Sequence, residues 1–261
     1  MKLITHEANS REGYAKEIVS VLAVPFNGGC LGKNIGCEKA PKAILEGKEF
    51  QVLDIDNQNI ISTNEVLGNA EGDIFIGGDH SITYSLFKGF SKDKENIGLV
   101  IFDAHPDCVN NFSPPTHEDF LKVLIEEEIV KPENVLIIGL RKIDEIEQKF
   151  LDQKNIKYVL AKDLENEKEI YHSIDKIREF VEKLDSWYLS IDIDVLNPKE
   201  APGTGYIEEG GMNFDQLFIL LEHIKHFGKL WRIDLVEVNP DKDINGKTIN
   251  CAKKILSIFE R

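Results

Sequence analysis

Eight short apolar runs, separated by polar and amphipathic segments, constrain the fold of this 261-residue chain most strongly. They are IVSVLAVPF (18–26), QVLDI (51–55), DIFI (73–76), IGLVIF (97–102), NVLII (134–138), KYVLA (157–161), WYLSIDI (187–193) and LWRIDLVEV (230–238). Such runs are typical of strands buried on both faces in parallel sheets. Amphipathic stretches such as EDFLKVLIEEEI (118–129) and EIYHSIDKIREFVEKLD (169–185) separate several of them. The alternation predicts an α/β fold, a three-layer α/β/α sandwich around a central, mostly parallel sheet.

Length and charge set further bounds on the chain. No linker-like segment interrupts the alternation, so we expect a single domain over residues 1–261 that closes with a helical end at 254–261. The formal net charge of −15 disfavours binding to nucleic acid or to an anionic membrane. No apolar run is long enough to span a bilayer, and MKLITHEANSREG (1–13) lacks a secretory apolar core. These features predict a cytoplasmic protein.

The four cysteines lack the spacing of a zinc ribbon, and we expect reduced thiols at Cys30, Cys37, Cys108 and Cys251. Cys108 directly follows Asp107, but no base is evident beside it. It is therefore not expected to act as a nucleophile.

Three acid- and histidine-rich motifs stand at the ends of apolar runs: GGDHS (77–81), DAHPD (103–107) and SIDIDVLNP (190–198). In open α/β sheets the site lies beyond the carboxyl ends of the strands, so the motifs are expected to converge. Asp103, His105 and Asp107 alternate and would project to one side of an extended segment. Asp192 and Asp194 repeat that spacing.

Together with His80, these residues offer four carboxylates and two imidazoles, which is too many ligands for one small ion. Two divalent ions such as Mn²⁺ with bridging carboxylates would fit. Taken singly, the motifs have other interpretations, because loop aspartates often cap helices, and Asp79 or Ser81 could cap a helix that begins near Ile82. Burying all six without a cation would cost several kcal/mol per charged group. Jointly they indicate a binuclear metal site.

These motifs resemble those of the ureohydrolase family, the arginases and agmatinases, which take the forms GGDHS, DAHxD and SxDxDxxDP. Three further segments extend the resemblance over nearly the whole chain: GCEKAPKAI (36–44), APGTGYIEEGG (201–211) and VEVNP (236–240). The resemblance implies an arginase-like fold, often assembled as a trimer or hexamer. It also implies an amidinohydrolase with two manganese ions that acts on a small cationic guanidino substrate.

The resemblance assigns the six ligands as follows: His80 and Asp107 to one manganese, His105 and Asp194 to the other, and Asp103 and Asp192 to both. Water activated by the metals would attack the guanidinium carbon. By the same resemblance Glu237 would hold the guanidinium, because a carboxylate accepts paired hydrogen bonds from its planar fork. The alternative is that Glu237 is a solvated residue after its strand.

His117 is the candidate proton shuttle, since family members carry such a histidine in the loop after DAHxD. The loop here reads CVNNFSPPTHEDF (108–120) and lacks the glycine that follows the histidine in family forms. Alternatively, Thr116 caps a helix from His117 onward, with Asp119 as the capping-box acid and His117 facing solvent.

Several features bear on the substrate. The loop from Asp107 to His117 is short and lacks the SGNxHG-like segment of arginases, and GGDHSIT and APGTG resemble agmatinases, which favours agmatine, hydrolysed to putrescine and urea. IGLRKID (138–144) instead resembles arginases, where the aspartate contacts the substrate's α-amino group. Asp144 could do so here, could bind the distal ammonium of agmatine, or could simply begin a helix. Arginase activity (L-arginine to ornithine and urea) and another guanidino or formimino substrate stay open.

Two departures from the family motifs remove no ligand: Asn197 replaces an aspartate, and Tyr206 replaces a smaller residue and could alter the pocket wall. A noncatalytic metal-binding relative is a competing hypothesis. A deacylase with one zinc ion fits poorly, because such a site needs only about three protein ligands. The same oxygen and nitrogen ligands would also accept cobalt, nickel or iron.

Overall fold

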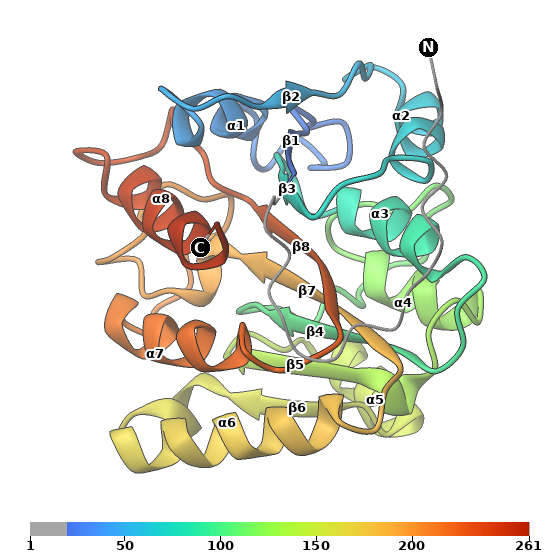
Figure 1. Cartoon of the computed structure of the whole chain (residues 1–261), viewed down its shortest axis with the longest axis vertical. Helices are drawn as coiled ribbons and strands as arrows, with labels where there is room; N and C mark the ends of the chain where they lie inside the picture. Colours follow the sequence, from blue (N-terminus) through green and yellow to red (C-terminus); the bar gives the residue numbers. More distant parts are fainter. Residues whose placement is uncertain (1–19, 261) are drawn as a thin grey trace.

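One eight-stranded sheet forms the centre of the computed structural model, which describes residues 20–260 (Figure 1). Its strands are β1 (Val21–Ala23), β2 (Gln51–Val52), β3 (Ile74–Ile76), β4 (Ile97–Phe102), β5 (Val135–Leu140), β6 (Lys157–Leu160), β7 (Ser186–Asp192) and β8 (Leu230–Val236). They lie in the order β2-β1-β3-β8-β7-β4-β5-β6, and all neighbouring pairs are parallel. Each apolar run overlaps one strand, so the predicted parallel sheet is confirmed.

Helices cover both faces of this sheet (Figure 1). On one face lie α1 (Ala40–Ile44), α6 (Glu167–Val181), α7 (Phe214–Ile224) and α8 (Lys247–Phe259), and on the other α2 (Ile60–Leu67), α3 (Ile82–Ser91), α4 (Phe120–Glu126) and α5 (Glu145–Lys154). Successive strand side chains point to opposite faces, so Val100 and Phe102 pack with the first set while Leu99 and Ile101 pack with the second. The three-layer sandwich is therefore confirmed.

The order of the central strands explains how distant motifs meet. β3, β8, β7 and β4 are consecutive neighbours in the sheet. GGDHS follows β3, Glu237 follows β8, Asp192 ends β7 and DAHPD follows β4. Because all four strands are parallel, these segments lie at one edge of the sheet, in the place where α/β folds build their sites.

Gly78 allows the tight turn between β3 and α3. A Cβ there would lie 1.8 Å from the carbonyl oxygen of Phe26, a distance that no other residue could tolerate. The carbonyl of Gly78 accepts a hydrogen bond from the Glu237 N–H at 2.7 Å. Asp79 accepts from the N–H groups of Ser81 and Gly29, both at 2.9 Å. The turn thus joins three segments that surround the site.

In the described part of the chain, no helix has the length and apolar character needed to cross a membrane. All four cysteines are buried and free, in agreement with the expected reduced thiols. The expected C-terminal helix is present as α8, and Arg261 lies outside the described residues, as does the N-terminal segment 1–13.

Candidate metal centre

Within the described residues, two groups could hold a metal ion: His80, Asp103 and Asp107 form one, and Asp103, His105 and Asp194 the other. In each group the ligand atoms lie within 4.8 Å of one another, and Asp103 belongs to both. Asp192 joins them, since its Oδ2 lies 3.3 Å from His80 Nδ1. The structure therefore brings together all six residues that the motifs predicted as ligands.

Short distances and burial make this cluster electrostatically costly without a cation. His80 Nδ1 lies 3.1 Å from both Asp103 Oδ2 and Asp107 Oδ2, and His105 Nδ1 lies 3.0 Å from Asp194 Oδ2. The four carboxylates are buried, and the His105 side chain is only 17% exposed. Bulk water therefore screens little of the mutual repulsion between these carboxylates.

The orientation of His80 fits a metal ligand. Its Nε2 lies 2.8 Å from Ser190 Oγ, and the Ser190 hydroxyl donates to Asp234 Oδ1 at 2.6 Å. Nε2 therefore serves as the donor, and the free nitrogen Nδ1 faces the carboxylates. Within the described residues, His80 Nδ1 and Asp103 Oδ2 are buried without a hydrogen-bond partner. A divalent cation between them would satisfy both atoms.

Ser190 and Asp234 were not singled out from the sequence. Asp234 is fully buried, and its Oδ2 accepts hydrogen bonds from Thr83 Oγ1 and Tyr188 Oη, both at 2.7 Å. It thereby fixes the hydroxyl that orients His80. The available signal was a carboxylate inside the apolar run LWRIDLVEV, because a buried acid needs a set of donors.

The pKa values describe a site that carries protons when no metal is bound. Burial and then the Asp103 carboxylate raise the pKa of Asp107 to about 7. Burial alone would lower the pKa of His105, but Asp194 and Asp103 raise it to about 12. Burial alone would raise the pKa of Asp194, but His105 and Arg141 lower it to about 2. Metal binding would therefore displace protons.

Arg141 holds the segment after β7. Its Nη2 donates to the carbonyl oxygens of Asp194 at 2.5 Å and Leu196 at 3.1 Å. Within IGLRKID the sequence drew attention instead to Asp144, which is the N-cap residue of α5. The Asp144 side chain is 55% exposed and lies 3.2 Å from Lys142 Nζ. Its place at the helix start agrees with the capping interpretation, although it also lines the cavity described below.

Glu237 is 4% exposed, so its interpretation as a solvated residue is wrong. Its Oε1 accepts from the His80 N–H at 2.7 Å and lies 3.2 Å from His117 Nδ1. Its Oε2 accepts from Asn34 Nδ2 at 2.6 Å. Glu237 and Asp107 have φ values of 64° and 52°. This left-handed backbone is costly for residues other than glycine and is common at functional sites.

Asn34 is a further residue that sequence reasoning missed. It is fully buried, and its Oδ1 accepts from Asn239 Nδ2 at 2.7 Å. The amide thus links the asparagine of VEVNP to the carboxylate of Glu237. Because Asn34 and Glu237 are 203 residues apart, no local pattern could have revealed the contact.

His117 is buried, with 4% of its surface exposed, and α4 begins only at Phe120 with Asp119 as its N-cap. The alternative of a helix capped by Thr116 and a solvent-facing His117 is therefore wrong. The reason is that Asp119 Oδ1 accepts from both Thr116 N at 2.7 Å and Thr116 Oγ1 at 2.6 Å, which closes a turn before the helix. Burial alone would lower the pKa of His117, but Glu237 raises it to about 9.

A cavity of about 170 Å³ opens beside the cluster. Its inner wall contains His105, Asp107, His117, Asp192, Asp194 and Glu237. Val109 and the buried Glu147 also line it. We call the five less buried polar residues of the lining the rim: Glu118, Lys142, Asp144, Tyr206 and Glu208. The rim holds three carboxylates and one ammonium group.

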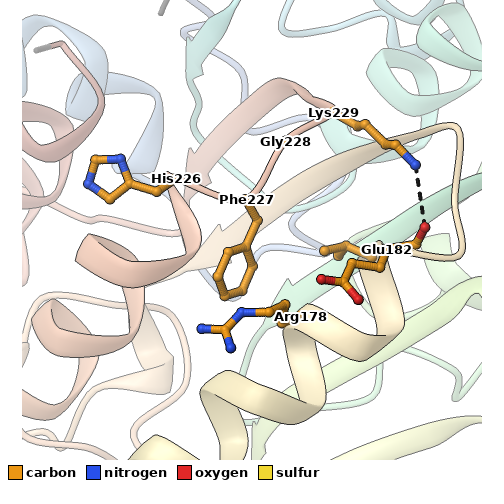
Figure 2. Close-up of a pocket in the computed structure, with 7 residues that line it drawn as sticks. Arg178, Glu182, His226, Phe227, Gly228 and Lys229 are labelled. Carbon is orange, nitrogen blue, oxygen red and sulfur yellow. Dashed lines mark hydrogen bonds between the residues drawn. The ribbon is translucent and has the colours of Figure 1, made fainter. Parts of the chain in front are cut away.

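A separate hollow of about 320 Å³ lies at the start of β8 (Figure 2). Glu237 and the smaller cavity are at the opposite end of that strand. The cations of the hollow already have partners. Lys229 Nζ donates to the carbonyl of Leu184 at 2.6 Å, and the Arg178 guanidinium lies 3.0 Å from Asp175 and stacks on Phe227. None of the six candidate ligands lines it, so we assign the chemistry to the smaller cavity.

Comparison with known proteins agrees with this assignment. The arginase family model matches residues 50–259. The arginase of Staphylococcus aureus (strain COL) is 29% identical over 225 residues, which cover 80% of this chain and 74% of that protein. The crystal structure of arginase from Bacillus subtilis superposes with a TM-score of 0.83 at 26% identity, covering 93% of this chain and 98% of that one.

The agmatine ureohydrolase of Thermoplasma volcanium has a TM-score of 0.75 at 22% identity, over 94% of each chain. At this identity the likeness concerns the fold alone. Proteins named for different substrates thus share this architecture. The family model and the cluster lead to one conclusion: the chain belongs to the arginase family and is a hydrolase that acts on guanidino C–N bonds.

Proposed function

We propose that the protein is a binuclear manganese amidinohydrolase that hydrolyses agmatine to putrescine and urea. One observation carries this proposal. Two groups of histidine and carboxylate ligands share Asp103, and the buried carboxylate of Glu237 lines the same cavity.

The six cluster residues would hold the two ions as follows: His80 and Asp107 one, His105 and Asp194 the other, with Asp103 and Asp192 shared. Carboxylate and imidazole ligands without thiolates suit manganese. When bound, ions of this kind activate water as a nucleophile at neutral pH.

Glu237 would receive the guanidinium group of the substrate. The His80 N–H and the Asn34 amide hold its two oxygens in a fixed orientation. His117 is the third contact of this carboxylate, and a bound guanidinium can replace it. The carboxylate would thereby keep the guanidinium carbon next to the metal ligands.

His117 would supply the proton that the leaving amine needs. Burial alone would lower the pKa of His117, but in the protein without metal or substrate Glu237 raises it to about 9, so this imidazole can hold a proton inside the cavity. Because Nδ1 lies 3.2 Å from Glu237 Oε1, the ring stands beside the proposed guanidinium position. A positioned imidazolium can transfer its proton as the C–N bond breaks.

The charges of the rim favour a substrate with a cationic tail. Glu118, Asp144 and Glu208 contribute three carboxylates, whereas the single cation, Lys142, pairs with Asp144 at 3.2 Å. The distal ammonium of agmatine would be attracted here. The carboxylate of arginine would meet mostly like charge. Arginine is the second candidate, because the similar Staphylococcus aureus and Bacillus subtilis proteins are arginases and Asp144 lies on the rim.

The test is urea release from agmatine and from L-arginine, measured side by side after the purified protein has been stripped of metal and reloaded with Mn²⁺. We expect strong turnover of agmatine and little of arginine. A preference for arginine would overturn the argument from the rim charges. Saturable binding without product, with two metals bound, would instead favour a noncatalytic relative.

A further inference from the structure

Two of the residues that depart from the family motifs contact each other beside the site. Glu118 stands where family forms place glycine after the histidine, and Tyr206 replaces a smaller residue in APGTG. The Tyr206 hydroxyl donates to Glu118 Oε1 at 2.5 Å, although the residues are 88 positions apart. Residues from two separate motifs thus form one hydrogen-bonded pair.

Glu118 is held in place by its own loop. Its carbonyl accepts from the Val109 N–H at 3.1 Å, and its Oε2 accepts from Asn110 Nδ2 at 3.3 Å. The neighbouring His117 N–H donates to the carbonyl of Gly29 at 3.1 Å. These contacts leave the carboxylate with lone pairs still available, since an ionised carboxylate offers about four acceptor positions.

The Tyr206 ring stands against both histidines of the cavity. Its centroid lies 5.8 Å from that of His117 with the rings 24° from parallel, and 5.6 Å from that of His105. Both Tyr206 and Glu118 line the cavity of about 170 Å³. The ring therefore narrows the part of the cavity, next to the cluster, that the tail of a substrate would occupy.

Glu118 differs from the other rim carboxylates in its partners. Asp144 pairs with Lys142, and Glu208 Oε1 lies 3.8 Å from His105 Nε2. Among the residues that the structure describes, Glu118 has no cationic partner; its contacts are a phenol and an amide. Its negative charge is not neutralised by a described cation of the protein and can attract a substrate cation.

We propose that the Tyr206–Glu118 pair selects the substrate by its tail: Glu118 receives the distal cationic group of a guanidino compound, and the Tyr206 ring excludes tails that carry an additional branch. This inference rests on the proposed function and adds the residues that decide specificity. An unbranched tail with a terminal ammonium fits both conditions, whereas the α-carboxylate of arginine violates both.

The experiment uses three compounds that share a guanidino group and an unbranched chain: agmatine with a cationic tail, n-butylguanidine with a neutral tail and 4-guanidinobutyrate with an anionic tail. They are assayed with the manganese-loaded wild type and Glu118→Gln. Glutamine keeps an oxygen that accepts from Tyr206, but it loses the negative charge together with the acceptor for Asn110 Nδ2. We expect KM for agmatine to rise about tenfold with kcat nearly unchanged, and KM for butylguanidine to stay within about twofold. Discrimination against 4-guanidinobutyrate should weaken.

Glu209→Gln is the matched control, because Glu209 is exposed near the rim but does not line the cavity. It should leave all three KM values unchanged. Tyr206→Thr restores a small residue, and we expect it to raise kcat/KM for L-arginine relative to agmatine. Tyr206→Phe keeps the ring and should not.

Equal changes for agmatine and butylguanidine in Glu118→Gln would overturn the proposal, because they would indicate a general disturbance rather than a lost charge contact. If the wild type hydrolyses neither agmatine nor arginine, the proposed function is wrong, but the proposed role of the Tyr206–Glu118 pair is not yet tested by that result. In that case calorimetric titration of the three compounds tests the pair directly. The ratio of Kd for butylguanidine to Kd for agmatine should fall about tenfold in Glu118→Gln, and an unchanged ratio would refute the selection by tail charge.

Discussion

The cluster of six candidate ligands and the rim border the same cavity, but they are built from different kinds of segment. The six ligand candidates belong to three short motifs at the ends of the central strands β3, β7 and β4, and burial, Ser190 and Arg141 hold them. The rim residues come from loops and are partly exposed, and their contacts, such as that of Tyr206 with Glu118, join distant segments. The difference agrees with our proposal that the cluster performs the chemistry while the rim selects the substrate.

The largest effect is expected in the cluster. Asp103→Asn and Asp192→Asn should each lose most of the bound metal and more than about 100-fold in activity, because a shared carboxylate is replaced by a neutral amide. Metal content per chain and urea release measure this, with circular dichroism to check the fold. Full occupancy and activity in both variants would refute the assignment of these residues as bridging ligands.

Glu237→Gln separates substrate binding from metal binding. Metal content should stay normal while kcat/KM falls by about 100-fold or more, because the amide cannot accept two hydrogen bonds from the guanidinium fork. Steady-state kinetics beside metal analysis gives both readouts. Normal kinetics would remove Glu237 from the mechanism.

Asn34 tests whether the inner wall depends on distant support. Asn34→Ala removes the donor to Glu237 Oε2 and should lower kcat/KM by about tenfold with metal retained. Asn34→Asp should be worse, since it sets a second carboxylate against Glu237. Thermal unfolding of both variants shows whether the loss is local. Equal kinetics in Asn34→Asp and the wild type would show that the amide does not position Glu237.

The pair of His117 and Glu237 predicts a pH effect on the metal-stripped protein. The pKa of His117 in the folded state, about 9, is above its ordinary value of 6.5, so the folded state binds this proton more tightly. The resulting stabilisation, up to about 3 kcal/mol, is complete below about pH 6.5 and is lost as the pH rises through about 9. Urea denaturation of the wild type and His117→Asn should therefore differ most at low pH and converge above pH 9. A constant difference across this range would contradict the assignment.

The smallest effect is expected at Asp144 on the rim. Asp144→Asn should change KM for agmatine by no more than about twofold, because the side chain is 55% exposed, pairs with Lys142 and can be replaced as an N-cap by asparagine. A tenfold rise in KM would move the tail contact from Glu118 to Asp144. It would also remove the distinction drawn between the rim carboxylates.

Much of the fold and the whole set of ligand candidates could be predicted from local patterns. The apolar runs located every strand, because buried parallel strands need continuous hydrophobic sequence. The motifs located the six ligand candidates, since several acids and histidines at strand ends are hard to explain otherwise. Ser190, Asp234 and Asn34 escaped prediction. Their roles come from partners such as His80 and Glu237, which lie more than 100 residues away.

The sequence by itself determined the sheet, its helical layers and the residue types of the candidate ligand cluster, because periodicity and motif spacing are properties of neighbouring residues. Only the tertiary structure decided that His117 is buried beside Glu237, that Asp144 begins a helix, and that Tyr206 contacts Glu118. Those facts depend on which distant loops meet at the edge of the sheet. That meeting results from the packing of the whole chain, and no local pattern records it.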